Sequence, residues 1–596
     1  MKDLSMIWNC LIGQRYSSVS REANQNDSSE SEDKTNDEST STSRRKSSVV
    51  VNRYFNTTLP VHEDARSRWP KSIFTLMTLA LVGIAFGSLI ILVDPYSLLF
   101  NLKIILREGG ETFELWRKPD VDLFLKVYLF NVTNHEEYLS GKDEQMHFQE
   151  IGPYVYKENL EHGNVKFNDN GTVSAIPLHP LTYVPEMSNG TEDDMMILPN
   201  IALFSIAQLM RDSSYITRWG LNMVIRQTDS NPLVPMTARE FMFGYDSALV
   251  SLGNNVMPSW IKFGKLGLID RMYDFEGDYE TVYTGEKDMH KGGLIEKYNG
   301  DVNLPQWTGK CANINGASDG TKFPSGLKKN DSILFFRKSL CRSERMEHVG
   351  DEIIDGLHTY QYKFLEHELD NGAVNPENKC FCRHGRCLKY GLIDVADCYY
   401  GFPIALSYPH FYKTDPSILA SMKGFDPKPE HHESFAFIQP DSGLPVRLAF
   451  RFQINMVLDD IGRIARVEKF ENVTLPLLWF EIGLKELPKA IALRFWLYLN
   501  VLPVVQDVGT YAMLLSGFVL CIWSIIKILL YQPKANNPAT DWQPTERELK
   551  IMECMHNRRK MSKSKENEAY YTSLLNILVS IRFLYSQCSG LVEENP

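Results

Sequence analysis

The sequence predicts an α+β fold: one large, β-rich domain with a group of inserted helices, anchored to a membrane by two helices. Three observations support this prediction. Two long apolar runs lie toward the two ends of the 596-residue chain. Short strand-like segments separated by Gly, Pro and Asn turns fill most of the sequence between them. Six of the ten cysteines also lie there, which is typical of a domain that folds in an oxidising compartment.

The first 72 residues are predicted to form a cytoplasmic tail without a stable fold. Up to about residue 65 the tail is rich in Ser, Asn, Asp and Glu and has few apolar positions. Such a composition does not bury enough surface to offset the entropy lost on ordering the chain. The formal net charge of −11 comes partly from this tail, so it says little about ligands.

Residues 73–93 and 508–531 are the two predicted transmembrane helices. The first run has 21 residues without a formal charge, and at about 1.5 Å per residue it crosses a hydrocarbon core of roughly 30 Å. The second is uncharged from Val508 to Ile526, and Lys527 lies where its ammonium group reaches the interface. Because about 70 residues precede the first run, it is expected to remain as an uncleaved anchor.

Basic residues beside the two runs predict that both ends of the chain are cytoplasmic. Cytoplasmic flanks carry an excess of lysine and arginine. Residues 94–507 are then external or luminal, and residues 532–596 form a second cytoplasmic tail. The basic residues are Arg66, Arg68, Lys71, Lys527, Lys534, Arg547 and Lys550.

Asn-X-Ser/Thr sites in the external segment predict a glycoprotein. We expect the sequons at Asn26 and Asn56, on the cytoplasmic side, to stay bare. The external sequons are at Asn131, Asn170, Asn189, Asn330 and Asn472.

The even number of external cysteines predicts three disulfides, for which the sequence alone allows fifteen pairings. A zinc site made by four of them with His384 is the alternative, but C-x-C spacing is unusual for structural zinc and the compartment favours oxidation. We expect no metal and no cofactor. The six cysteines are Cys311, Cys341, Cys380, Cys382, Cys387 and Cys398.

Local patterns divide the external segment into strands and helices. Asn170-Gly171 predicts a hairpin turn between strands in residues 165–176. Apolar residues recur at helical spacing between about Leu198 and Leu252, which predicts short helices inserted into the β-rich body. A paired His431-His432 flanked by glutamates is expected in an exposed charged turn. Gly83 and Gly87 form a G-x-x-x-G step that permits close helix packing, including packing in a homo-oligomer.

Several motifs between the two apolar runs occur together in an order that resembles the class B scavenger receptors. This family includes fatty acid translocase, the lysosomal integral membrane protein and insect sensory neuron membrane proteins, and the resemblance runs from about residue 70 to residue 531. The motifs are Ile151-Gly152-Pro153-Tyr154-Val155-Tyr156, Arg239-Glu240 with Gly244-Tyr245, Cys380-Phe381-Cys382, and Leu406-Ser407-Tyr408-Pro409-His410-Phe411.

The resemblance implies a β-barrel-like external domain with an apical helical bundle and an apolar tunnel toward the bilayer. It also implies the disulfides Cys311–Cys380, Cys341–Cys398 and Cys382–Cys387. A basic ligand-capturing residue of the family corresponds to a position close to Arg226, and Arg211 and Arg218 lie at helical spacings that allow a shared cationic face. The alternative is that these arginines solubilise an exposed helix.

The function expected from the resemblance is that of a cell-surface or endosomal receptor that binds lipids or lipoprotein-like particles and passes hydrophobic cargo to the membrane. Fatty acids, sterol esters, carotenoids and lipoprotein or apoptotic-cell surfaces all fit as partners, whereas nucleic acid does not. We expect no enzyme, because no nucleophile elbow or zinc-protease motif is present. A lysosomal receptor that escorts a partner protein, and a two-span ligand-gated channel, are the alternatives.

Overall fold

The structure is a computed structural model that describes residues 71–530 except residues 252–264, 384 and 400. The predictions for the two tails, including Asn26 and Asn56, therefore lie outside the described residues.

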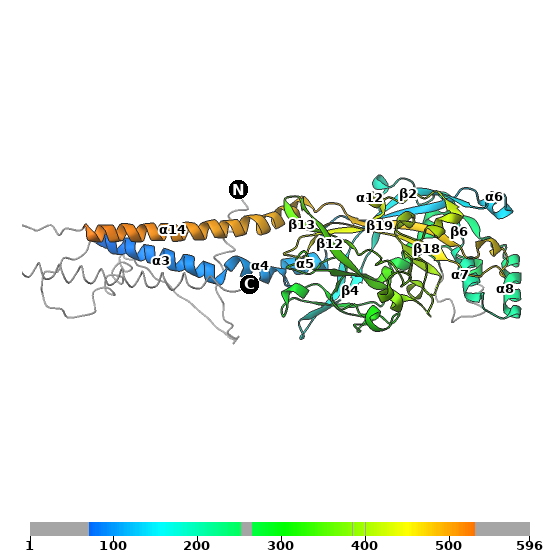
Figure 1. The fold of residues 1–596 in the computed structure, drawn as a ribbon, viewed down its shortest axis with the longest axis horizontal. Helices are drawn as coiled ribbons and strands as arrows, with labels where there is room; N and C mark the ends of the chain where they lie inside the picture. Colours follow the sequence, from blue (N-terminus) through cyan, green and yellow to red (C-terminus); the bar gives the residue numbers. More distant parts are fainter. Residues whose placement is uncertain (1–70, 252–264, 384, 400, 531–596) are drawn as a thin grey trace, which may run out of the picture. The chain divides into compact units, whose positions relative to one another are not determined.

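A 13-stranded sheet forms the body of the domain between the two long apolar helices (Figure 1). Ten strands follow the order β10-β11-β12-β13-β17-β18-β19-β1-β2-β16, and the other three branch from this path. The strands are β1 (Leu123–Val132), β2 (Met146–Glu158), β5 (Leu181–Tyr183), β10 (Ala317–Ser318), β11 (Ile333–Arg337), β12 (Arg342–Ile354), β13 (Leu357–Phe364), β14 (Ile393–Asp394), β15 (Ile404–Ser407), β16 (Met422–Lys423), β17 (Phe435–Ile438), β18 (Pro445–Val457) and β19 (Thr474–Leu484).

The predicted α+β class and antiparallel pairing are confirmed, but the strand path does not close into a barrel. Its two end strands, β10 and β16, each have two residues and pair in parallel with β11 and β2. The described strands form no pairing between β10 and β16. The barrel-like shape implied by the resemblance is therefore corrected to an open, branched sheet, because strands this short end the hydrogen-bond ladder.

The centre of this sheet joins the first and last strands of the domain. Leu123 to Leu129 of β1 pair with Leu484 to Leu478 of β19, and β1 pairs with β2 on its other side. Residues 474–480 of β19 are all buried, on both faces of the strand. A strand covered on both faces reads as a continuous apolar run rather than an alternating one.

A second sheet has the strand order β3-β4-β8-β9 and contains the predicted hairpin. Gly171 in its turn has φ +83°, a left-handed conformation that glycine adopts without strain. The strands are β3 (Glu161–Asn168), β4 (Thr172–Leu178), β8 (Glu280–Tyr283) and β9 (Ile295–Tyr298).

The predicted helical insertion is present, but it is carried by a hairpin that periodicity did not reveal. Strands β6 (Met195–Pro199) and β7 (Leu233–Thr237) pair with each other, and helices α7 (Ile201–Met210) and α8 (Tyr215–Gln227) lie between them in the chain. Helix α9 (Ala238–Phe243) follows β7. Asn200 and Ser214 cap α7 and α8 with side-chain oxygens, which satisfies backbone donors at the helix starts.

Two helices are long and apolar enough to cross a membrane. The first contains α3 (Lys71–Val93) and α4 (Pro95–Ile104). The second contains α13 (Lys489–Trp496), the π-helix η10 (Leu497–Val501) and α14 (Leu502–Leu529). Helices α3 and α14 run side by side (Figure 1).

The G-x-x-x-G step lies in the contact between these two helices. A Cβ on Gly83 would lie 3.8 Å from Cα of Gly517 on α14, and one on Gly87 would lie 2.9 Å from the side chain of Leu514. The glycines therefore bring α3 close to α14 of the same chain, and this face is not open to a second copy.

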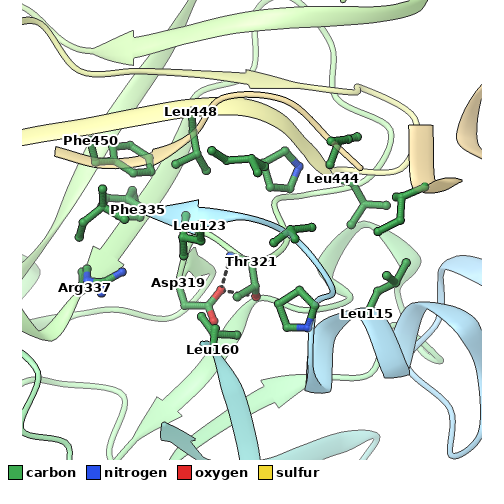
Figure 2. Close-up of a pocket in the computed structure, with 18 of the residues that line it drawn as sticks. Leu115, Leu123, Leu160, Asp319, Thr321, Phe335, Arg337, Leu444, Leu448 and Phe450 are labelled. Carbon is green, nitrogen blue, oxygen red and sulfur yellow. Dashed lines mark hydrogen bonds between the residues drawn. The ribbon is translucent and has the colours of Figure 1, made fainter. Parts of the chain in front are cut away.

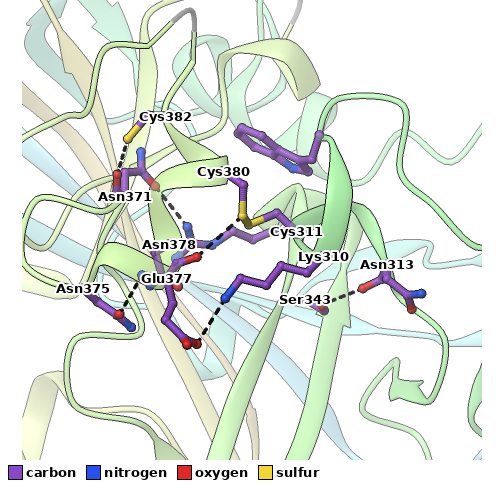
Figure 3. Close-up of a disulfide and its surroundings, with 12 residues drawn as sticks. Lys310, Cys311, Asn313, Ser343, Asn371, Asn375, Glu377, Asn378, Cys380 and Cys382 are labelled. Carbon is purple, nitrogen blue, oxygen red and sulfur yellow. Dashed lines mark hydrogen bonds and ion pairs between the residues drawn. A yellow bond between two sulfur atoms is a disulfide. The ribbon is translucent and has the colours of Figure 1, made fainter.

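Three disulfides join Cys311 to Cys380, Cys341 to Cys398 and Cys382 to Cys387. Figure 3 shows the first of them beside the ion pair of Lys310 with Glu377, whose Nζ and Oε2 are 3.2 Å apart. The four cysteines of the zinc alternative are thus held as disulfides, and His384 lies outside the described residues.

The expected exposure of the His431-His432 turn is wrong for one of its residues. His431 is exposed, but His432 is buried and its ring stacks on that of His410 with 4.4 Å between centroids. His432 Nδ1 accepts a hydrogen bond from the Lys428 N–H, so the turn is fixed from inside.

Candidate functional site

An apolar cavity of about 100 Å³ lies against the inner face of the main sheet (Figure 2). Leu123 from β1, Phe335 from β11 and Leu448 and Phe450 from β18 form one side of it. Each of these side chains occupies a core-facing position of its strand, so the sheet itself supplies an apolar wall.

A second apolar cavity of about 350 Å³ lies where the sheet meets the membrane helices. Leu99 and Phe100 come from α4, Leu499 from η10, and Leu502 and Val505 from α14. The two cavities share three lining residues, Leu115, Leu444 and Phe495. They are therefore neighbours with a common wall, and a lipid chain that passed between them would have an apolar path from the sheet to the membrane helices.

Polar side chains lie at both ends of this path. At the membrane end, Lys103 Nζ is 3.0 Å from Oε2 of Glu111 and 2.9 Å from the Tyr498 hydroxyl. At the inner end, Asp319 and Arg337 line the first cavity (Figure 2). An amphiphile between these ends would have an apolar surround for its chain and polar groups for its head.

Arg337, at the inner polar end, is paired with a buried carboxylate. Arg337 donates from Nη2 to Oε1 of Glu158 at 3.0 Å, and Nδ1 of His179 is 2.6 Å from the same oxygen. Burial alone would raise the pKa of Glu158, but the positive charge of Arg337 and the hydrogen bond with His179 outweigh it and lower this pKa to about 2. Glu158 therefore stays ionised and holds Arg337 at the cavity wall.

The three arginines of the proposed apical face lie in different surroundings. Arg211 is the residue after α7 and pairs with Asp459, while Arg218 donates to the carbonyl oxygens of Arg211 and Ser213 at 3.0 and 2.6 Å. Both stabilise the turn between the helices. Arg226, in the last turn of α8, is exposed and forms no ion pair with any other described residue.

Four of the five sequon asparagines are exposed. Asn131 differs because it lies within β1, is only half-buried, and its Oδ1 accepts a hydrogen bond from the Ile197 N–H at 2.9 Å. The exposed four are Asn170, Asn189, Asn330 and Asn472.

Sequence reasoning did not find the lining of the two cavities. The lining residues come from strands and helices spread over more than 400 positions, from Pro95 to Gln506. Apolar residues on strands are the commonest signal in a β-rich sequence, so nothing distinguishes those that face a cavity from those that fill the core.

Comparison with known proteins agrees with this architecture. The CD36 family profile matches residues 74–528. The chain is 31% identical over 477 residues to scavenger receptor class B member 1 of Mus musculus, which covers 79% of this chain and 92% of that protein. It is 27% identical over 394 residues to Protein peste of Drosophila melanogaster, covering 65% and 70%, and 29% identical over 420 residues to Lysosome membrane protein 2 of Homo sapiens, covering 70% and 86%. With a profile match over most of its length, this chain belongs to the CD36 family, the class B scavenger receptors.

Proposed function

We propose that the protein is a scavenger-type receptor that takes up lipid and passes it along the apolar path to the outer half of the membrane. The main support for this proposal is that the two apolar cavities share a wall and that residues of the membrane helices line the second cavity. Both termini lie in the cytoplasm in this proposal. The plasma membrane or an endosomal membrane is the place of action.

The energetic reason for such a path is the cost of exposing an acyl chain to water. Each CH₂ group costs roughly 0.8 kcal/mol, which amounts to about 12 kcal/mol for a long fatty acid. A covered apolar route removes most of that barrier. Movement down the gradient of the lipid then needs no nucleotide, and the chain has no Gly-Lys-Ser/Thr phosphate loop.

Leu444 is the position at which to test the path, because it lines both cavities. Leu444→Trp should fill their common wall and reduce uptake of a fluorescent fatty acid by cells that display equal surface amounts of protein. Leu493→Trp is the matched control, since Leu493 is exposed on α13 and lines neither cavity. Native mass spectrometry of the purified protein should show less retained lipid for Leu444→Trp alone. Equal uptake by the two variants would contradict the proposal.

Arg226 is proposed to attract an anionic lipid head group before the lipid enters the domain. It is exposed, whereas Arg211 and Arg218 are engaged within the protein. Arg226→Glu should reduce uptake of a fatty acid and leave uptake of an uncharged sterol ester unchanged, while Arg226→Lys should keep part of the uptake. Unchanged uptake of both lipids by the Glu variant would leave Arg226 as a residue that only solubilises α8.

A receptor that escorts a partner protein in the lysosomal system is the second candidate function. The similarity to Lysosome membrane protein 2 favours it over the channel alternative. Pull-down of the full chain from endosomal and plasma-membrane fractions separates the two receptor functions. A stable protein partner together with normal lipid uptake by Leu444→Trp would favour the escort function.

A further inference from the structure

Three side chains that are far apart in the sequence meet in the interior next to the first cavity. His162 lies on β3, Glu280 on β8, and Asp319 directly after β10. Nε2 of His162 is 2.9 Å from Oε1 of Glu280 and 3.6 Å from Oδ2 of Asp319. One ligand atom from each residue lies within 4.8 Å of the others. His162 and Glu280 are buried, and Asp319 also lines the cavity.

These separations fit a bound metal ion. In a tetrahedral site with metal–ligand bonds of about 2.0–2.2 Å, neighbouring ligand atoms lie about 3.3–3.6 Å apart. The two measured separations, 2.9 and 3.6 Å, need only small rotations to reach that geometry. One imidazole and two carboxylates are a ligand set that zinc and other first-row divalent cations accept.

The orientation of His162 is fixed as metal sites require. Its Nδ1 is 2.8 Å from the carbonyl oxygen of Trp116, and because a carbonyl only accepts, Nδ1 carries a proton. Without an ion, Nε2 donates to Oε1 of Glu280 in the same way, and a bound ion would take the place of that second proton. The imidazole also stacks on the Trp116 ring with 4.0 Å between centroids. Nε2 is therefore directed at the two carboxylates. A histidine ligand whose other nitrogen donates to a backbone carbonyl is the usual arrangement around zinc.

Asp319 is held just as firmly by neighbours that are not part of the cluster. Its Oδ1 accepts hydrogen bonds from the Thr321 N–H at 2.8 Å and the Thr321 hydroxyl at 2.6 Å (Figure 2). The second oxygen, Oδ2, is the one nearest His162. The carboxylate thus presents one oxygen to the cluster while the other is occupied.

Within the described part of the chain, no lysine or arginine lies within ion-pair distance of the cluster. Among the described residues, His162 is the only ion-pair partner of Glu280 and Asp319, since Arg337 pairs with Glu158 and the Nζ of Lys322 donates only to neutral oxygens. When both carboxyls are ionised, two carboxylates and one imidazole carry a net negative charge whether or not the imidazole is protonated. A buried charge without a partner is costly, and a divalent cation with a neutral imidazole brings the group to zero.

We propose that His162, Glu280 and Asp319 bind one divalent first-row metal ion, with zinc as the best fit, and that the cavity side supplies a water as the fourth ligand. The ion would join β3 and β8 of the four-stranded sheet to the loop after β10 of the main sheet. It would be a structural site that stiffens the inner end of the apolar path. This departs from the expectation of a protein without metal.

Metal content of the full-length glycosylated protein, purified in detergent without chelator, tests the proposal directly. We expect about one equivalent of zinc by inductively coupled plasma mass spectrometry, as for a single site with three protein ligands. His162→Gln should reduce the metal content at least about tenfold. His179→Gln is the matched control, because His179 is a half-buried histidine paired with a single carboxylate, and it should keep the metal.

A second variant keeps the test valid if His162→Gln fails to fold. Thr321→Val removes one hydrogen bond to Asp319 and preserves side-chain shape, so the folded protein should bind Zn²⁺ about 10-fold more weakly after stripping with a chelator. Stripped wild-type protein should melt at a lower temperature and recover with Zn²⁺ but not with Mg²⁺. Absence of metal from wild type, with no response of Tm to chelator or Zn²⁺, would overturn the proposal and leave His162 as an imidazolium paired with two carboxylates.

Discussion

The side chain of Gln506 holds Asp94 at the point where the first membrane helix ends. Gln506 donates from Nε2 to Oδ1 of Asp94 at 2.8 Å, and its Oε1 accepts from the Tyr96 N–H at 2.7 Å. Asp94 itself has a φ of 43° and accepts from the Ser97 N–H at the start of α4. One amide therefore fixes the bend between α3 and α4 against α14.

Replacing Gln506 should loosen this bend. Gln506→Glu keeps the size of the side chain but directs a carboxylate at Asp94, so we expect a loss of about 1–3 kcal/mol in unfolding free energy. Thermal unfolding of the purified protein in detergent measures the effect. Asp507→Asn, at the exposed neighbouring position, is the control and should not change Tm. A Gln506→Glu protein as stable as wild type would show that the contact is not important.

The helix contact should be sensitive to the size of residue 517. A Cβ on Gly517 would lie 2.7 Å from the Ile84 side chain and 3.1 Å from the Ala80 carbonyl oxygen, whereas one on Gly509 meets no atom within 4 Å. Gly517→Leu should separate α3 from α14 and lower Tm, by the roughly 1–3 kcal/mol typical of overpacking. Gly509→Leu, on the same helix, should be tolerated. Similar Tm values for the two variants would contradict the close packing.

The three disulfides should differ in importance. Cys341–Cys398 closes a loop with a sequence separation of 57 and Cys382–Cys387 one with a separation of 5. Chain entropy removed from the unfolded state makes the longer loop worth about 4 kcal/mol and the shorter one less. Cys341→Ser should thus be retained in the endoplasmic reticulum far more than Cys382→Ser. Digestion with endoglycosidase H measures retention, and equal resistance of the two variants would contradict this ranking.

Glycan occupancy should follow the exposure of the asparagines. Mass spectrometry of glycopeptides should find glycans at the four exposed sequons and the lowest occupancy at Asn131, whose side chain accepts from Ile197. Asn131→Gln should also lower Tm, since the Ile197 N–H loses its partner, whereas Asn330→Gln should remove a glycan only. High occupancy at Asn131 would contradict this prediction, because it would show that the side chain is accessible to glycosylation before it packs against Ile197.

Stability should fall in acid because His432 resists protonation. Burial, and then the neighbouring His410, lower the pKa of His432 to about 4. The unfolded chain, with a pKa near 6.5, binds more protons between those values, so stability is lost as the pH falls from about 6.5 toward 4 at up to about 1.4 kcal/mol per pH unit. His432→Gln should flatten the profile of Tm against pH, and His431→Gln, at the exposed neighbour, should not. Parallel profiles for wild type and His432→Gln would exclude this role.

The parts of the fold that could be predicted are those determined by short stretches of sequence. An uncharged run of 21 residues indicates a span, Asn170-Gly171 indicates a hairpin, and a 3.6-residue period indicates the helices of the insertion. The hairpin of β6 and β7 was missed because each of its strands has only five residues, and α7 and α8 separate them in the chain. Local pattern gives no sign of which strand will pair with which.

Burial of polar residues was the weakest part of the sequence reasoning. His432 follows Pro429 and Glu430 and has the composition of a surface turn, yet it packs on His410 from a different segment. His162 and Glu280 are 118 positions apart, and only the order of the second sheet brings them together across β4. Contacts of this kind depend on the order of the strands in the sheet, which cannot be read from the local sequence.

Because β1 pairs with β19, the middle of the main sheet is assembled from the two ends of the segment between the membrane helices. During synthesis, β1 emerges from the ribosome long before its partner. At about 5–20 residues per second the wait lasts on the order of tens of seconds. For that time one edge of β1 is open to chaperones or to wrong partners. A premature stop codon after β1 and before β19 would leave this edge unpaired, so truncated products should be recognised and degraded.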